Sequence, residues 1–203
     1  MRRSPEDIAA LGFSPHTGWA AAVAVTPEWE IIERRRIVYE PEAARFIYHH
    51  AAEIPRDEAA AVIATARAQA TNKAQEQIRA LISALSRKGK PVFDVCAPGG
   101  NVRLPTSLPD ILSVHARIHA AEGVFYRDVL ADGCAQNGLA VRRVPERDLW
   151  AVASKALACH EDKLRERLAK LGKQLGPPWG EDQKRATLAA LIALNSGMIK
   201  AQV

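Results

Sequence analysis

The sequence predicts an α/β protein of three layers, in which a five-stranded mixed sheet lies between helices on both of its faces. Three short apolar segments open the chain and are separated only by turn residues, as in an antiparallel meander. Two further short apolar segments each follow a helical segment, which is the usual right-handed route to another strand of the same sheet. A helical segment closes the chain, so helices are available for both faces.

The meander is predicted from three runs of residues. An apolar run over residues 8–13 forms the first strand, and because Pro15 cannot donate to a sheet ladder, the strand should turn there. Residues 18–25 are too few for an independent helix and are bounded by glycine and proline, which favours a buried strand. The third strand, over residues 29–39, is rich in Ile, Val, Trp and Tyr.

The remaining elements follow from helical spacing and from turn residues. The longest helix is alanine-rich, carries apolar residues at helical spacing and ends at Gly89. Residues 97–107 contain two glycines and several polar residues and are expected to form a loop. We expect helices over residues 42–52, 56–88, 108–136, 146–171 and 181–202, and strands over residues 91–96 and 139–144.

Length and composition suit one domain. With 203 residues, 48% hydrophobic and 25% charged, we expect residues 1–203 to form a single domain that the linker and helix of residues 175–203 close. No signal peptide and no apolar run of membrane-spanning length is visible, which favours a cytoplasmic protein that binds no membrane. The cysteines Cys96, Cys134 and Cys159 are widely spaced, so free thiols are expected.

The first strand and its turn carry a resemblance to a known family. Gly12-Phe13-Ser14-Pro15-His16-Thr17-Gly18 resembles the Gly-Ile-Asp-Pro-Gly-x-x-x-Thr-Gly pattern of RuvC-type Holliday-junction resolvases, with a shorter spacer. The resemblance implies a ribonuclease H-like fold. The metal-binding aspartate of that family corresponds to Ser14 here, and a neutral hydroxyl is a poor replacement for a carboxylate around a hard divalent cation.

The same resemblance implies where chemistry would take place. Nucleases of this fold gather carboxylates from the first strand, the fourth strand and the closing helix around two metal ions. We therefore take Asp94, Glu122 and Glu181 as the candidate catalytic residues. The candidate ligands of Mg²⁺ or Mn²⁺ are Asp94, Glu122, Glu181 and Asp182.

Asp94 and Glu122 each have an alternative interpretation. Asp94 lies in the strand expected beside the first one, but a carboxylate there also suits a cap on nearby backbone amides. Glu122 falls on an apolar helical stripe together with His115, so it should meet a cation, a metal or a hydrogen-bond donor. His115 and His119 have the spacing of helical metal ligands, although a histidine on such a stripe is more often a core residue.

The closing helix begins with two acids. Glu181 starts the core-facing stripe, and Asp182 points about a quarter turn away. An acid in the first turn of a helix also complements the helix dipole, and Lys184 is placed to neutralise Glu181. Lys184 and Arg185 stand where the family pattern has a second acid.

Basic residues suggest a polyanionic partner without requiring one. The net charge is +5 and the sequence pI is about 9.3. Three consecutive arginines interrupt the third strand, and further cations lie along the helix of residues 146–171, where mixed charges are also typical of a solvated face. The candidate contacts to nucleic acid are Arg34, Arg35, Arg36, Lys163 and Arg167.

Two functions remain open from the sequence. The first is a divergent resolvase-like protein that binds nucleic acid, such as branched DNA. If it is an enzyme, it would be a Mg²⁺- or Mn²⁺-dependent, structure-selective endonuclease with a degenerate active site that hydrolyses phosphodiester bonds. The alternative is a catalytically inactive ribonuclease H-like scaffold that acts through self-association, for example as a homodimer, or through a protein partner. The change at Ser14 favours the alternative.

Overall fold

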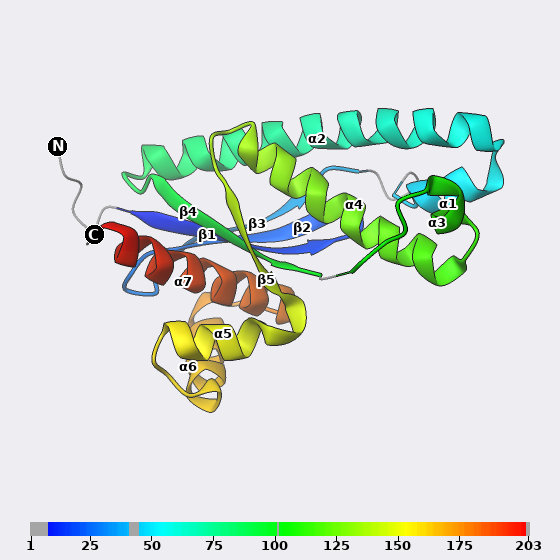
Figure 1. Ribbon diagram of the computed structural model, residues 1–203. Helices are drawn as coiled ribbons and strands as arrows, with labels where there is room; N and C mark the ends of the chain where they lie inside the picture. Colours follow the sequence, from blue (N-terminus) through cyan, green and yellow to red (C-terminus); the bar gives the residue numbers. More distant parts are fainter. Residues whose placement is uncertain (1–7, 41–44, 101, 202–203) are drawn as a thin grey trace.

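The sheet has the predicted number and arrangement of strands. The computed structural model describes residues 8–40, 45–100 and 102–201. One mixed sheet has the order β3-β2-β1-β4-β5, with helices on both faces (Figure 1). β1, β2 and β3 pair antiparallel, and β4 and β5 continue the sheet in parallel with β1. The strands are β1 (Ala9–His16), β2 (Trp19–Val25), β3 (Ile31–Val38), β4 (Val92–Gly99) and β5 (Val141–Pro145). Because β1 is the central strand, residues 14–17, which we call the β1 corner, lie at the C-terminal end of the central strand.

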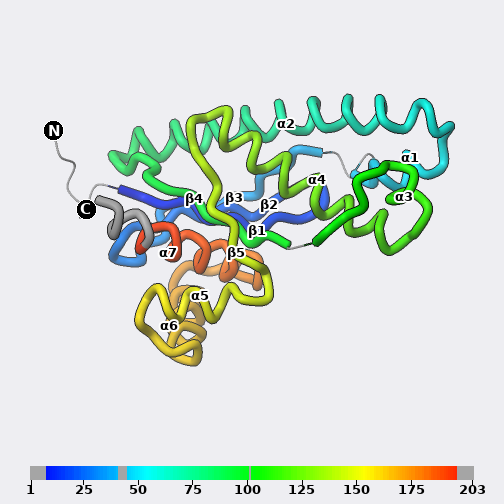
Figure 2. Tube along the Cα trace, in the orientation of Figure 1, coloured from blue at the N-terminus to red at the C-terminus, as the bar shows by residue number. Residues whose placement is uncertain are grey.

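Two layers of helices cover this sheet. α2 and α4 cross one face, whereas α7, with α5 and α6 beyond it, covers the other (Figure 1, Figure 2). The helices are α1 (Ile47–Glu53), α2 (Arg56–Arg87), α3 (Leu108–Leu112), α4 (His115–Ala135), η3 (Glu146–Asp148), α5 (Leu149–Ala156), α6 (Glu161–Leu175) and α7 (Glu181–Ala201). Within the described ranges, no helix combines the length and the apolar character needed to cross a bilayer.

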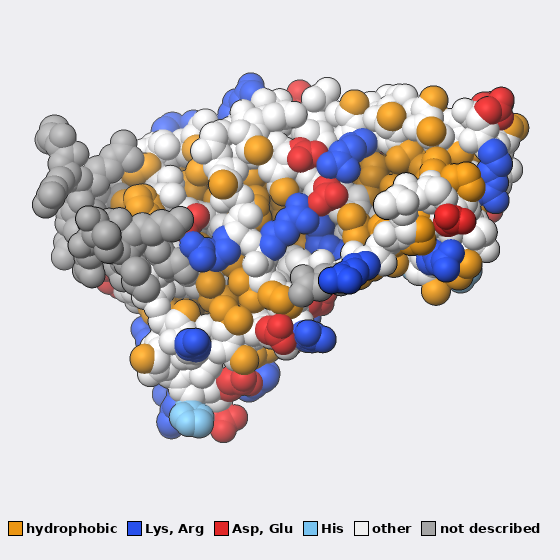
Figure 3. Space-filling view, viewed as in Figure 1, with side chains coloured by type: hydrophobic (Ala, Val, Ile, Leu, Met, Phe, Trp, Pro, Cys, Tyr) orange, Lys and Arg blue, Asp and Glu red, His pale blue; other side chains and the backbone are white. Residues whose placement is uncertain are grey.

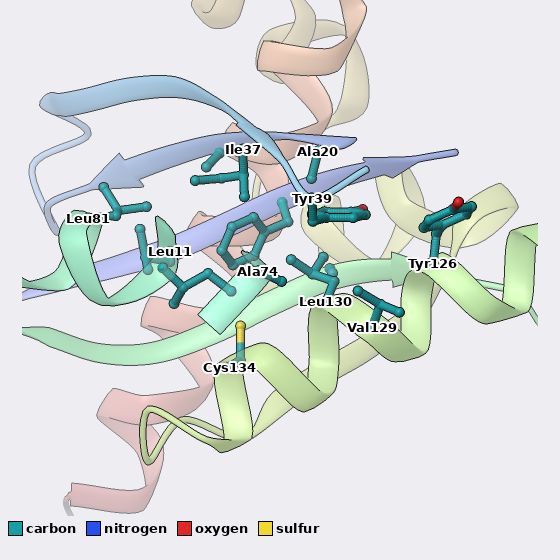
Figure 4. Packing of buried hydrophobic residues seen from close by; sticks show 14 of the residues in the cluster. Leu11, Ala20, Ile37, Tyr39, Ala74, Leu81, Tyr126, Val129, Leu130 and Cys134 are labelled. Carbon is teal, nitrogen blue, oxygen red and sulfur yellow. The ribbon is translucent and has the colours of Figure 1, made fainter. Parts of the chain in front are cut away.

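A large buried cluster joins the sheet to α2 and α4. Leu11, Ile37 and Tyr39 meet Leu81 of α2 and Leu130 of α4 (Figure 4). Burial of each large side chain contributes roughly 1.5–3 kcal/mol. The hydroxyl of Tyr39 donates to the backbone oxygen of Trp19 at 2.9 Å, which satisfies a polar group inside the cluster.

On the opposite face, α7 packs against β1 without an intervening side chain. A Cβ built on Gly12 would lie 1.7 Å from the backbone oxygen of Ala186 and 2.4 Å from the backbone nitrogen of Ala190. Only glycine therefore fits at this position. Alternate residues of a strand face the same side, so Ser14 also faces α7. The close approach at Gly12 brings the first turn of α7 to the β1 corner.

Two strands are longer than the sequence predicts. β1 continues through Pro15 to His16, where a turn at Pro15 is predicted. The last residue pair between β1 and β4 is Gly12 with Cys96, so Pro15 has only Ala20 of β2 as its partner in the sheet. The lack of an N–H on Pro15 therefore costs no hydrogen bond to β4. β4 in turn extends to Gly99, into the segment predicted to be a loop.

Two predicted helices are divided. The helix predicted over residues 108–136 is α3 and α4, because the Ser113 hydroxyl donates to the Asp110 carbonyl at 2.9 Å and Val114 is extended. The helix predicted over residues 146–171 is η3, α5 and α6, because the chain reverses after α5 through Ala158, whose φ is 47°.

The other predicted helices are shifted only at their ends. α1 begins at Ile47, and residues 42–44 of the predicted helix lie outside the described residues, as does Gln202 at the predicted end of the last helix. The cysteines Cys96, Cys134 and Cys159 are free, as predicted.

Candidate functional site

The β1 corner is held against the start of α7 by two hydrogen bonds. Ser14 is buried, and its hydroxyl donates to Oδ1 of Asp182 at 3.4 Å. His16 Nε2 contacts the same oxygen at 2.7 Å. Asp182 is the second residue of α7, whose position is set by the close packing at Gly12. The carboxylate of Asp182 is thus occupied by two side chains of β1.

A row of stacked side chains extends from this carboxylate toward β3. The His16 ring stacks on Trp19 with 4.3 Å between ring centroids and 11° between ring planes. The guanidinium carbon of Arg36 lies 4.0 Å from the centroid of the Trp19 ring. Such a cation–π contact is worth roughly 0.5–2 kcal/mol. The exposed Arg36 therefore places a positive charge at the end of a row that begins at Asp182.

A cavity of about 230 Å³ opens beside the β1 corner. Its charged lining consists of two arginines and one carboxylate, Arg127 of α4, Arg185 of α7 and Glu146 of η3. Arg185 and Glu146 form an ion pair at 2.7 Å. The cavity has room for a phosphate group with part of its sugar, since one water molecule occupies about 30 Å³ in the liquid. The lining residues are Ser14, Pro15, His16, Thr17, Pro98, Gly123, Arg127, Glu146 and Arg185.

Arg127 is the cation of this cavity that protein groups leave available. Within the described parts of the chain, its guanidinium forms no hydrogen bond and no ion pair. Partial burial lowers the pKa of Arg127 from its usual value, and Glu146 opposes that shift. A guanidinium stays charged through such changes and offers a planar fork of donors that matches phosphate. The arrangement is suited to binding an oxyanion.

The donor set at the β1 corner does not fit a pair of Mg²⁺ or Mn²⁺ ions. These ions need several charged oxygen ligands. Ser14 is neutral, and Pro98 is the residue that β4 contributes to the cavity. Asp182 is already bonded to Ser14 and His16, and Arg185 lies three residues further along α7. The remaining carboxylate, Glu146, is paired with Arg185.

The predicted catalytic acid of β4 lies away from this corner. Asp94 pairs in register with Ala10, four residues before Ser14, and four residues of a strand span roughly 13 Å. Its carboxylate accepts from the backbone N–H of Val95 at 2.9 Å and lies 3.9 Å from Arg142. Asp94 thus has the backbone-capping contact that the alternative interpretation predicts.

Glu122 is buried and partnered, in agreement with its predicted place on an apolar stripe. Its Oε1 accepts from the backbone N–H groups of Tyr48 at 2.7 Å and His49 at 3.3 Å. His49 Nδ1 is also 3.3 Å from this oxygen. Burial raises the pKa of Glu122, and these hydrogen bonds oppose the shift. The carboxylate joins α4 to α1 and does not line the cavity.

The two acids of α7 have exchanged the roles that the sequence predicts. Glu181 is exposed and paired with Lys184 at 2.6 Å, whereas Asp182 reaches Ser14. Among the described residues, one group of His, Cys, Asp and Glu side chains lies close enough to hold a metal together, and none of the predicted acids belongs to it. The joint metal site predicted for Asp94, Glu122, Glu181 and Asp182 is therefore not assembled.

Most of the predicted nucleic-acid contacts have partners within the protein. Arg34 donates to three backbone oxygens at the end of α6, those of Leu175, Gly176 and Pro178, at 2.8–3.2 Å. Arg35 pairs with Glu33 at 3.3 Å. Arg36 differs, because it is exposed and stacks on Trp19 beside the β1 corner.

The two predicted contacts on α6 lie elsewhere. Lys163 pairs with Glu166 at 3.1 Å, and the guanidinium carbon of Arg167 lies 3.7 Å from the Trp29 ring centroid. Trp29 follows β2, at the end of the sheet away from Ser14. On the face seen in Figure 3, Lys and Arg side chains are spread over α4 and β5 with acidic side chains between them. Between these two elements, Arg143 of β5 and Asp128 of α4 form an ion pair at 2.7 Å.

Sequence reasoning missed Arg127, Trp19 and Glu146 as residues of the site. Nothing in the local pattern of α4 distinguishes Arg127 from other surface arginines, because its place depends on how α4 crosses the sheet. Arg185 had a signal, since a basic residue stands where the resemblance leads to an acid. That signal indicates a lost metal ligand, and the structure adds that the arginine lines the cavity.

The strand order, the two helical layers and the position of the corner define a ribonuclease H-like fold of the RuvC type. No protein-family model matches the chain, and no curated protein does. Among solved structures, the chain is similar to Thermus thermophilus RuvC, with a TM-score of 0.50, 10% identity and coverage of 95% of this chain and 97% of that one. The chain is also similar to T. thermophilus RuvC in complex with a Holliday junction substrate, with a TM-score of 0.52, 11% identity and coverage of 95% of this chain and 96% of that one.

Proposed function

We propose that this chain binds the sugar–phosphate backbone of nucleic acid at the β1 corner and does not cleave it. The observation that carries the proposal is the charge of the cavity, where Arg127 and Arg185 outnumber the single carboxylate of Glu146. The guanidinium of Arg127 forms no hydrogen bond and no ion pair among the described residues, so a phosphate would supply the missing acceptors. Binding of this kind needs no divalent ion.

Branched DNA is the ligand that the structural similarity favours. One similar structure is T. thermophilus RuvC with a Holliday junction substrate, and the similarity covers nearly the whole of both chains. In the present chain, the exposed Arg36 ends the row that runs from Asp182 through His16 and Trp19, so it supports a second backbone contact beside the cavity. We assign Arg36 and Arg127 to the DNA interface, and we assign Arg34, Lys163 and Arg167 no contact with DNA.

Loss of cleavage follows from the donor set. Hydrolysis of a phosphodiester by two metal ions requires carboxylates that bridge and flank them. Here β1, β4 and α7 contribute Ser14, Pro98 and Arg185 to the cavity, and none of the three is a carboxylate. The carboxylate of Asp182 is bonded to Ser14 and His16. The chain is therefore proposed as a binding protein, with the degenerate site retained for phosphate recognition.

Fluorescence anisotropy with a labelled four-way junction at low salt in EDTA tests this function. We expect Arg127→Gln to weaken binding about tenfold or more, because a charged hydrogen bond contributes roughly 1.5–3 kcal/mol. Arg167→Gln is the matched control and should bind as the wild type does. A junction that stays intact with Mg²⁺ or Mn²⁺ supports the proposal. Cleavage would contradict it, and so would the absence of DNA binding, which would favour the scaffold alternative.

A further inference from the structure

A cluster of three histidines lies on the side of α4 that faces α1. His115 and His119 are one turn apart at the start of α4, and His49 comes from α1. One ring nitrogen of each lies within 4.8 Å of the others. The ring centroids are 4.4–5.4 Å apart. Chain segments far apart in the sequence thus converge on one point.

The closest contact in the cluster joins two nitrogens of the same type. Nε2 of His119 lies 2.9 Å from Nε2 of His115. One of the two must carry a proton for this to be a hydrogen bond. A metal ion can replace that proton, and tetrahedral Zn²⁺, with bonds of about 2.0–2.1 Å, holds its nitrogen ligands about 3.3 Å apart.

The third histidine is oriented by a buried carboxylate. Oε1 of Glu122 lies 3.3 Å from Nδ1 of His49, which leaves Nε2 of His49 as the ring nitrogen without that partner. Metal-binding histidines commonly give their second nitrogen to a carboxylate in this way. Glu122 itself is fixed by the backbone N–H groups of Tyr48 and His49.

We propose that His49, His115 and His119 bind one Zn²⁺ ion and leave its fourth position open to water or an exogenous ligand. Three neutral imidazoles are a donor set that suits Zn²⁺ and not Mg²⁺. His115 and His119 are exposed, so the ion can enter from solvent. The site is separate from the β1 corner and does not depend on the proposed binding of DNA.

The ion would join α1 to the half of α4 that carries Gly123. Gly123, which lines the cavity, is one turn after His119, or about 6 Å along the helix. Among the described residues, Glu122 is the one that links the two helices through its carboxylate. Zn²⁺ would add a second link and would therefore raise the unfolding temperature.

Titration calorimetry with Zn²⁺, together with the visible absorption of bound Co²⁺, tests the site. We expect one equivalent per chain and a weaker affinity, by about tenfold or more, in both His119→Ala and His49→Ala. His50→Ala is the matched control, since His50 is exposed on α1 next to His49, and it should bind as the wild type does. Glu122→Gln, which alters the carboxylate that orients His49, should weaken binding about 10- to 100-fold.

Three outcomes overturn the proposal. The first is that the wild type binds no Zn²⁺ at millimolar concentration. The second is that His49→Ala binds Zn²⁺ as tightly as the wild type, which would leave His115 and His119 as the only ligands of the ion. Equal weakening by His50→Ala would show that the histidines act without a defined geometry. Circular dichroism of each variant separates loss of ligands from loss of fold.

Discussion

Replacement of Gly12 by alanine should separate α7 from β1. The added Cβ would lie 1.7 Å from the Ala186 oxygen, whereas ordinary contacts begin at 3.4 Å. The helix must therefore withdraw by about 1.7 Å, because the groups that the new Cβ meets are the Ala186 oxygen and the Ala190 nitrogen, which are backbone atoms and cannot rotate away. Overpacking of a close-packed core usually costs about 1–3 kcal/mol, and we expect about 3 kcal/mol here.

Unfolding in urea, followed by circular dichroism, measures this cost. For a chain of this length, about 3 kcal/mol corresponds to a fall of roughly 6–12 °C in the melting temperature. Gly180→Ala is a suitable control, since its Cβ would meet Gln183 Oε1 at an ordinary 3.5 Å. It should cost less than about 1 kcal/mol.

The same change should disturb the β1 corner. Asp182 lies on α7 and contacts His16 at 2.7 Å, so a shift of the helix breaks that bond. We therefore expect weaker binding of DNA in Gly12→Ala even where the protein remains folded. If Gly12→Ala were as stable as Gly180→Ala, the close packing of α7 on β1 would be refuted.

Two other substitutions test separate parts of the molecule. Ser14→Asp should not create Mg²⁺-dependent cleavage, because Pro98 and Arg185 remain. It should also lower the free energy of unfolding by about 1–3 kcal/mol, because a second carboxylate is buried beside Asp182. Cleavage of a labelled junction by this variant would contradict the proposed loss of the metal site. Arg34→Ala should lower the free energy of unfolding in urea by about 2–4 kcal/mol, because its hydrogen bonds to three backbone oxygens are lost. Its affinity for DNA should stay unchanged. Reduced affinity for DNA in a stable Arg34→Ala protein would count against the structural role.

The sheet could be predicted from the sequence because its signals are local. Short apolar runs between glycine and proline identified the three strands of the meander, and the alanine-rich segment identified α2. Helix breaks were harder to predict. The Ser113 hydroxyl that ends α3 and the left-handed Ala158 after α5 occur in sequences that are also compatible with continuous helix.

The charged residues of the site could be predicted only in part. The burial of Glu122 followed from helical spacing, and its partners Tyr48 and His49 did not, because they come from another element. Asp182 was proposed as a ligand, yet its bonds to Ser14 and His16 depend on how closely α7 approaches Gly12. The position of Arg127 in the cavity could not be predicted, because it depends on how α4 crosses the sheet.

The nitrogen–proton NMR spectrum of the isotope-labelled protein distinguishes a phosphate site from a metal site, since it reports separately on Arg127 and on the β1 corner. Addition of a short DNA duplex in EDTA should shift the Nε–H signal of Arg127 and the backbone signal of His16. Addition of Mn²⁺ without DNA should leave the Ser14 and Asp182 signals sharp. Broadening of those two signals by Mn²⁺, with no response of Arg127 to DNA, would show that the corner holds a metal ion and not a phosphate.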